Sequence, residues 1–329
     1  MKRWVRHFGL LVGLVATVAF AFYAMHTLRG QDLSQYVSVS AIAGIGIAAM
    51  GYSLIIPISS LAWRRLLSDM GVDKSWGELS IIMGVTQLAK YIPGNIGQHV
   101  GRAAMSLGRG IPLRPYGISV VSEAVLAVIA ATVIGVTGCA LSGMSTTILR
   151  QHGALTLSIF MILACASALA IIPARHILPR LLQRLTARQN NDGVHVALPH
   201  ISALVYALIA YLLNYVIFGV GITVMALLLL PNQQAQWLLL TGSFALAWVI
   251  GFFTPGAPAG LGVREGLMLA MLQFSYAQPA ALLIVIAMRL ATTAGDIFCF
   301  AAGSTALFLQ RGRRHATAAN HLTGNDHET

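Results

Sequence analysis

Charged side chains are scarce in this chain. Asp, Glu, Lys and Arg make up 9% of the 329 residues, whereas 57% are hydrophobic, and the mean hydropathy is +0.76. So few polar side chains cannot cover the surface of a soluble globule of this size. The long apolar runs have the length of membrane-spanning helices. The sequence therefore predicts an all-α, polytopic membrane protein.

Cysteine and catalytic patterns are also scarce. Cys139, Cys165 and Cys299 lie far apart in apolar segments without a CxxC pair or a nearby His, so neither a disulfide framework nor a metal site is expected. No Ser-His-Asp set or paired carboxylates stand out, so we expect no enzyme activity and no cofactor. The net charge of +11 could suggest a nucleic-acid partner, but no soluble module carries clustered phosphate-binding side chains, which excludes one.

Apolar stretches set the expected organisation. Six are long enough to cross about 30 Å of hydrocarbon: residues 8–28, 37–62, 116–137, 153–172, 203–230 and 279–309. Two more stretches, 79–107 and 237–274, each contain a Pro-Gly break. The basic N-terminus and the first stretch imitate a signal peptide. However, that apolar run is too long for one, which favours an uncleaved first helix.

The Pro-Gly break occurs twice, each time with an arginine nine residues after the proline. The copies are Pro93-Gly94 with Arg102 and Pro255-Gly256 with Arg264, which are 162 residues apart. The chain therefore divides into two related halves, 1–137 and 138–309, followed by a tail at 310–329 that is expected to be disordered. Broken helices at matching places in two halves predict a transport site.

The distribution of basic residues predicts the topology. If both broken stretches are re-entrant hairpins and the six others cross fully, fifteen Lys and Arg lie on the N-terminal side of the membrane. Two, Arg29 and Arg150, lie on the other side, and four lie within membrane segments. This bias places both termini in the cytoplasm of a bacterial inner membrane and makes the two halves inverted. Two short crossings at each break remain an alternative.

Two segments are expected on the cytoplasmic surface. Arg180, Arg184 and Arg188 recur every four residues beside a row of leucines, so the connector 173–199 is predicted to be a basic amphipathic helix resting on anionic lipid. The stretch 64–76 has a similar pattern.

The first break predicts an anion site. Pro93 ends one helix, and Asn95 is placed to cap a second half-helix whose free N–H groups favour an anionic partner. Gly97 and Gly101 leave a bare face for close helix packing or for a ligand.

Basic groups flank the first break. Lys90, about 5 Å before Pro93, is expected to be the deepest one, and Arg102 is expected about 13 Å beyond, near the cytoplasmic mouth. The alternative for Arg102 is that it snorkels to the interface.

The second break differs from the first. Phe252 stands where the first copy has Lys90, and Glu265, next to Arg264, is free to pair with another basic group. Gly260 and Gly262 permit close backbone approach, but they do not form a GxGxxG motif in a βαβ context. The two halves are therefore not equivalent.

Charges within the membrane predict the sign of the site. The basic residues Lys90, Arg102, Arg264 and Arg289 stand against the acidic residues Glu123, Glu265 and Asp296, which leaves a charge of +1. A cavity of that sign favours an anionic headgroup, above all a phosphate. The alternative is that these residues form internal ion pairs that hold the bundle together. Further hydrogen-bonding candidates are Tyr91, Gln98, His99 and Asn214.

Two motifs carry a family resemblance. Residues 90–97 (KYIPGNIG) and 258–265 (PAGLGVRE), together with Glu123, resemble the membrane domain of lysylphosphatidylglycerol synthases and the wider flippase-like family. The resemblance implies a lipid-translocating fold with re-entrant helices. In the best-known members it implies movement of an aminoacylated phospholipid, and other members resemble partners of polyprenyl-linked glycan assembly. This chain departs from the pattern at Ala124, at Ala259 and in having no C-terminal aminoacyl-transferase domain.

We therefore expect about six full transmembrane helices plus two re-entrant hairpins in two inverted halves. The expected function is translocation of an anionic-headgroup lipid. The alternative is a non-catalytic scaffold for a glycosyltransferase or lipid-modifying enzyme, and homo-oligomerisation is left open. The residues expected to bind substrate are Lys90, Pro93, Gly94, Asn95, Gly97, Arg102, Glu123, Pro255, Gly256, Gly260, Gly262, Arg264, Glu265, Arg289 and Asp296.

Overall fold

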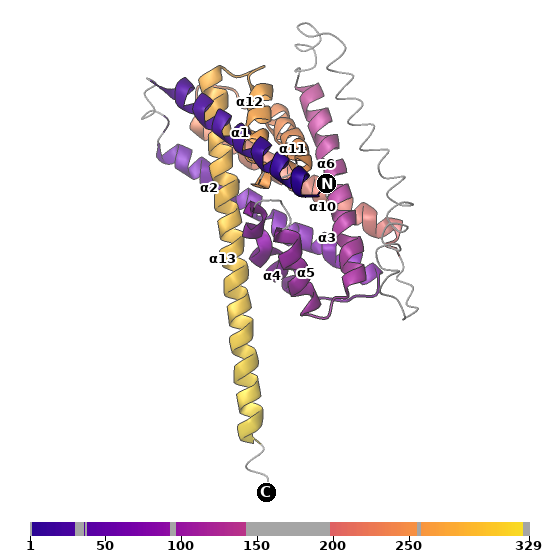
Figure 1. Ribbon diagram of the computed structural model, residues 1–329. Helices are drawn as coiled ribbons and strands as arrows, with labels where there is room; N and C mark the ends of the chain where they lie inside the picture. Colours follow the sequence, from indigo (N-terminus) through magenta and orange to yellow (C-terminus); the bar gives the residue numbers. More distant parts are fainter. Residues whose placement is uncertain are drawn as a thin grey trace.

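The computed structural model describes residues 2–29, 36, 38–92, 97–142, 198–254 and 258–324, and these ranges contain helices and turns but no strand. The first half contains α1 (Lys2–Leu28), α2 (Val39–Ser53), α3 (Ile55–Asp69), α4 (Trp76–Thr86), the 3₁₀ helix η2 (Gln87–Tyr91), α5 (Gly97–Leu107) and α6 (Leu113–Leu141). The second half contains α10 (Ile201–Leu229), α11 (Trp237–Phe253), the 3₁₀ helix η4 (Pro258–Gly260), α12 (Val263–Leu272) and α13 (Gln278–Gly324). Figure 1 shows their arrangement.

Side-chain caps define where two of these helices begin. The Ser38 hydroxyl accepts a hydrogen bond from the Ala41 N–H at 3.1 Å, and the Ser75 hydroxyl accepts one from the Glu78 N–H at 3.2 Å. Each cap satisfies a backbone donor that the first helical turn leaves free. The starts of α2 and α4 therefore follow from local sequence.

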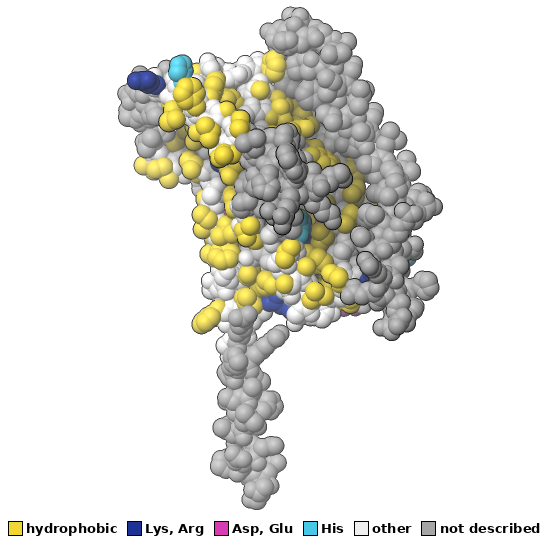
Figure 2. Space-filling view, viewed as in Figure 1, with side chains coloured by type: hydrophobic (Ala, Val, Ile, Leu, Met, Phe, Trp, Pro, Cys, Tyr) yellow, Lys and Arg dark blue, Asp and Glu magenta, His cyan; other side chains and the backbone are white. Residues whose placement is uncertain are grey.

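The exterior is apolar and the interior carries charge. Val39, Leu141 and Ile201 are 85%, 73% and 74% exposed, whereas Asp296 is 1% exposed. Hydrophobic side chains cover much of the face shown in Figure 2. Four candidate membrane spans are found among the described residues: Val39–Asp69, Leu113–Leu141, Ile201–Leu229 and Gln278–Gln310. The prediction of an all-helical, multi-pass membrane protein is confirmed.

The predicted stretches correspond closely to observed helices. Stretches 8–28, 37–62, 116–137, 203–230 and 279–309 fall on α1, α2 with α3, α6, α10 and α13. The broken stretch 79–107 falls on α4, η2 and α5, and the broken stretch 237–274 falls on α11, η4 and α12. The predicted span 153–172 and most of the connector 173–199 lie outside the described residues.

The helix order repeats along the chain. Helices α2, α4 and α6 begin at Val39, Trp76 and Leu113, and α10, α11 and α13 begin 162, 161 and 165 residues later. The contacts between helices repeat as well, with the first and second halves exchanged. Helix α6 packs on α11 as α13 packs on α4, and α13 packs on α2 as α6 packs on α10. Helix α2 itself packs on α10.

The two broken segments come together inside the bundle. Helix η2 contacts η4, while α4 and α5 lie toward one end of the bundle and α11 and α12 toward the other (Figure 1). Close packing of α4 on α13 depends on glycine, because a Cβ at Gly84 would lie 2.9 Å from the Cys299 carbonyl oxygen. The segment before the first break thus packs against the second half, and η4, which follows the second break, packs against η2 of the first half.

Two segments differ from the sequence expectation. Helix α3 continues through Asp69, and Leu66 and Leu67 are fully buried, so the first part of 64–76 packs into the bundle instead of resting on lipid. Helix α13 continues to Gly324, whereas a disordered tail was expected from 310. The Ala-rich end of this helix extends an existing helix, so it needs no new nucleation.

Candidate functional site

Beyond the second break, residues 258–262 form a tight irregular turn ahead of α12. Ala259, Gly260 and Gly262 have φ values of 50°, 69° and 80°, a region that is costly for alanine and open to glycine. The Gly262 N–H donates to the Glu265 Oε2 at 2.7 Å, so α12 has a carboxylate of its own chain at its N-terminus. The sequence analysis placed Gly262 and Glu265 among the residues expected to bind substrate, whereas here they bond to each other. Pro255 and Gly256 lie outside the described residues.

The side chain of Arg264 runs through a slot between two glycines. A Cβ on Gly251 would lie 2.2 Å from the Arg264 Cγ, and a Cβ on Gly260 would lie 2.5 Å from its Cδ. Only glycine leaves room for the arginine stem at these two positions. The guanidinium lies 5.6 Å from the centroid of the Phe244 ring, and Nη1 donates to the Ala259 carbonyl oxygen at 3.3 Å. The slot fixes the direction in which the charge points.

Asp296 collects the donors of the first break. Lys90 Nζ lies 2.6 Å from Asp296 Oδ1, and Gln87 Nε2 donates to the same oxygen at 2.9 Å. The Tyr91 hydroxyl donates to Oδ2 at 2.6 Å, and Lys90 also donates to the Tyr52 hydroxyl at 3.0 Å. A buried carboxylate with three donors is well stabilised. This cluster connects η2 of the first half to α13 of the second half.

Arg102 is buried and paired. Its Nη1 and Nη2 donate to the two Glu123 oxygens at 2.7 and 2.9 Å. The guanidinium stacks 3.6 Å from the centroid of the Trp63 ring, and Arg102 is 4% exposed. The alternative that Arg102 snorkels to the interface is therefore wrong, because its charge is satisfied inside the bundle.

Arg289 provides the partner expected for Glu265. Arg289 Nη1 lies 3.3 Å from Glu265 Oε1, and its guanidinium lies 5.6 Å from the centroid of the Tyr91 ring. Arg289 and Asp296 share one face of α13, as their spacing of seven predicts, but they serve different partners. Arg289 holds α12, and Asp296 holds η2.

The glycines after the first break serve packing. A Cβ at Gly97 would lie 2.6 Å from the Ala89 carbonyl oxygen, and a Cβ at Gly101 would lie 3.3 Å from Thr86 Cγ2. This bare face was predicted to serve either close helix packing or a ligand. The structure places backbone and side chains of the preceding segment against it, which is the packing use. Pro93, Gly94 and Asn95 lie outside the described residues.

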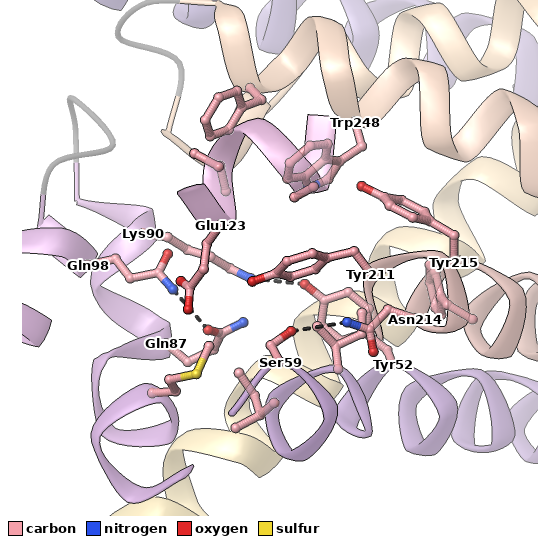
Figure 3. Close-up of a pocket in the computed structure, with 18 of the residues that line it drawn as sticks. Tyr52, Ser59, Gln87, Lys90, Gln98, Glu123, Tyr211, Asn214, Tyr215 and Trp248 are labelled. Atoms are coloured by element: carbon pink, nitrogen blue, oxygen red, sulfur yellow. Dashed lines mark hydrogen bonds between the residues drawn. The ribbon is translucent and has the colours of Figure 1, made fainter. Parts of the chain in front are cut away.

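A cavity of about 410 Å³ lies between the two halves. The first half lines it with residues that include Tyr52, Ser59, Gln87, Lys90, Gln98 and Glu123. The second half contributes Tyr211, Asn214, Tyr215, Trp248, Phe252 and Arg264, among others. Figure 3 shows most of these side chains around the cavity, with hydrogen bonds between Gln98 and Gln87, Lys90 and Tyr52, and Asn214 and Ser59. Lys90 and Phe252, which occupy matching positions in the two halves, both line it.

The charges reduce to one surplus cation. The three acidic groups pair with Lys90, Arg102 and Arg289. Within the described part of the chain, Arg264 has no carboxylate within 4.0 Å, and it lines the cavity. The sequence analysis gave internal ion pairs and a cavity with a charge of +1 as alternatives. The structure contains both, because three cations form ion pairs inside the bundle and Arg264 leaves one unmatched positive charge at the cavity.

Sequence reasoning missed most of the cavity wall on α10. Tyr211, Asn214, Tyr215 and Phe218 are spaced as one helical face, and all four line the cavity. Only Asn214 was a candidate, because tyrosine within an apolar helix resembles an ordinary core or lipid-facing residue. The recurrence of polar tips on one face was the available signal.

No cluster of three His, Cys, Asp or Glu that could hold a metal ion occurs among the described residues.

An apolar exterior, membrane-spanning helices and a charged cavity between two broken helices define a multi-pass membrane protein with an internal polar site. The family model for the lysylphosphatidylglycerol synthase TM region matches residues 8–303, so the chain belongs to this family. Membership associates the protein with a lipid-related function. A comparison with curated proteins gave no match.

Proposed function

We propose that this protein is a flippase-like transporter that moves a lipid with an anionic headgroup across a bacterial inner membrane without changing it chemically. The proposal rests on the environment of Arg264. Among the described residues it is the one intramembrane cation without a carboxylate partner, and it points into the cavity between the halves. A partly desolvated guanidinium favours a phosphate, which it can bind through two parallel hydrogen bonds.

The exchange of contacts between the halves supports alternating access. Helix α4 packs on α13 as α11 packs on α6, and η2 and η4, each adjacent to one break, contact each other. Two halves of opposite orientation, related in this way, can rock about a site held between them. The bias of Lys and Arg supports inversion of the halves and cytoplasmic termini.

The polar network gives each residue a role in the proposed cycle. The headgroup leaves the cytoplasmic leaflet, enters the cavity and binds Arg264, while its acyl chains stay in the bilayer. The Arg102–Glu123 and Lys90–Asp296 pairs keep the first break in place. Lys90, which lines the cavity, remains within reach of a phosphate during rocking. Release on the other side follows when the halves rotate.

The test is movement of labelled lipids between leaflets of liposomes that contain the purified chain. The proposal predicts faster movement of at least one anionic lipid than in protein-free liposomes. The trial set includes phospholipids and polyprenyl phosphates. No movement of any of these lipids would contradict transport and would favour the scaffold. A scaffold further predicts tolerance to substitution at Arg264 and sensitivity at Arg180, Arg184 and Arg188.

A further inference from the structure

The charges around the cavity limit the charge of the headgroup. Glu123 is the lining carboxylate, and the Arg102 fork occupies both of its oxygens at 2.7 and 2.9 Å. Asp296 is held by Lys90, Gln87 and Tyr91, and Glu265 by Arg289 and the Gly262 N–H. Each of these three carboxylates already has a cationic partner, and of the three only Glu123 lines the cavity. Arg264 matches one negative charge.

Polar groups on α10 select for hydroxyls. Asn214 is 5% exposed and lines the cavity. Its Nδ2 donates to the Ser59 hydroxyl at 3.0 Å, while its Oδ1 is buried without a partner among the described residues. If the amide is rotated, Oδ1 accepts from Ser59 and Nδ2 is left instead, so either orientation leaves one polar atom for a ligand.

Two tyrosines extend this wall. Tyr211 and Tyr215 lie on the same face of α10 as Asn214 and line the cavity with it (Figure 3). Neither hydroxyl forms a hydrogen bond with the residues that the structure describes. A phenolic hydroxyl both donates and accepts, so it suits another hydroxyl better than a cation. Buried polar atoms of this kind disfavour a ligand that leaves them unpaired.

We infer that the cavity binds a phosphodiester lipid with one negative charge and a neutral headgroup that carries hydroxyls. The phosphate pairs with Arg264, and the hydroxyls bond to Asn214, Tyr211 and Tyr215. The inference rests on the proposed function, because it takes the cavity as the headgroup site. It disfavours cationic headgroups such as lysyl, because their ammonium groups would have to compete with Lys90, Arg102 and Arg289 for the carboxylates of the described residues.

The test is lipid binding by the purified full-length chain, measured by native mass spectrometry with pairs of lipids that share acyl chains. Phosphatidylmethanol carries the same charge as phosphatidylglycerol but no hydroxyl, and lysyl-phosphatidylglycerol adds ammonium groups. Phosphatidylglycerol is expected to bind about fivefold or more tighter than phosphatidylmethanol and about tenfold tighter than the lysyl lipid. Equal or tighter binding of either competitor by the wild type would overturn the inference.

Two variants separate the contacts. Asn214→Leu should reduce the preference for phosphatidylglycerol over phosphatidylmethanol, with Tyr211 and Tyr215 keeping the remainder, whereas Arg264→Gln should weaken binding of both lipids by about tenfold. Arg64→Gln, which removes an exposed charge of α3, should change neither and serves as the matched control. An unchanged preference in a folded Asn214→Leu protein would contradict the role of the amide. If that variant does not fold, the wild-type comparison decides.

Further arms identify the source of the headgroup and separate the two proposals. A sugar linked through one phosphate to a polyprenol has the same chemistry. Preferential capture of it over phosphatidylglycerol assigns the site to polyprenyl lipids, and the reverse assigns it to glycerophospholipids. Phosphatidylglycerol preference without movement between leaflets would support this inference and contradict transport. Movement without the preference would do the opposite.

Discussion

Arg102 and Arg264 occupy the same place in the repeated motif but have opposite environments. Arg102 is held by both oxygens of Glu123 and stacked on Trp63, with 4% of its surface exposed. Arg264 passes between two glycines into the cavity and has no carboxylate partner in the described ranges. Its neighbour Glu265 is used by Arg289 instead.

This difference shows how a duplicated motif can be divided between stability and binding. A buried arginine with a bidentate carboxylate is a structural element, because its charge is already matched. An arginine whose guanidinium meets a carbonyl oxygen and an aromatic ring but no carboxylate keeps its charge available to a ligand. Repetition in sequence therefore marks where to look, while the surrounding side chains determine what each copy does.

The largest expected effect comes from breaking the ion pair between Arg102 and Glu123. Arg102→Met leaves Glu123 buried without its partner and should lower the free energy of unfolding by about 3–5 kcal/mol. Thermal unfolding in detergent measures the loss. The double variant Arg102→Met/Glu123→Leu should recover much of it, because no uncompensated charge remains. A double variant as unstable as the single one would show that the pair itself is not the cause.

A smaller effect is expected from narrowing the slot between glycines that holds the side chain of Arg264. In Gly251→Ala the new Cβ displaces the Arg264 stem, because the two would lie 2.2 Å apart. Lipid movement in liposomes should fall by about tenfold, as expected when a charge-assisted hydrogen bond is lost. Gly266→Ala, whose Cβ would meet nothing within 4 Å, should be near wild type. In an Arg264→Ala background, Gly251→Ala should have little further effect, and an equal further loss would argue against the slot.

The smallest expected effect relieves strain at the second break. Ala259 has a φ of 50°, so Ala259→Gly should raise the free energy of unfolding by up to about 1 kcal/mol. Ala103→Gly, within α5, should lower it by about the same amount, because glycine is a poor helix former. Thermal unfolding of the two variants checks the opposite signs. Destabilisation by Ala259→Gly would mean that the alanine methyl group has a packing role larger than the strain.

The sequence predicted the helical membrane fold, most of the helix positions and the presence of charged residues close to each Pro-Gly break. It did so because apolar length and Pro-Gly breaks are local signals. It could not tell which carboxylate each cation meets, since Lys90 and Asp296 are 206 residues apart in the chain. The roles of Gly251 and of Tyr211 were missed for the same reason, because each depends on a neighbour that only tertiary packing brings close.

The most direct test of this account is the rate of phosphatidylglycerol movement between liposome leaflets for Arg264→Gln, compared with wild type and with Arg64→Gln at equal amounts of folded protein. We expect Arg64→Gln to move lipid at the wild-type rate and Arg264→Gln to be slower by about tenfold or more with nearly unchanged thermal stability. An Arg264→Gln protein that moves lipid as fast as wild type would contradict the claim that this arginine binds the headgroup.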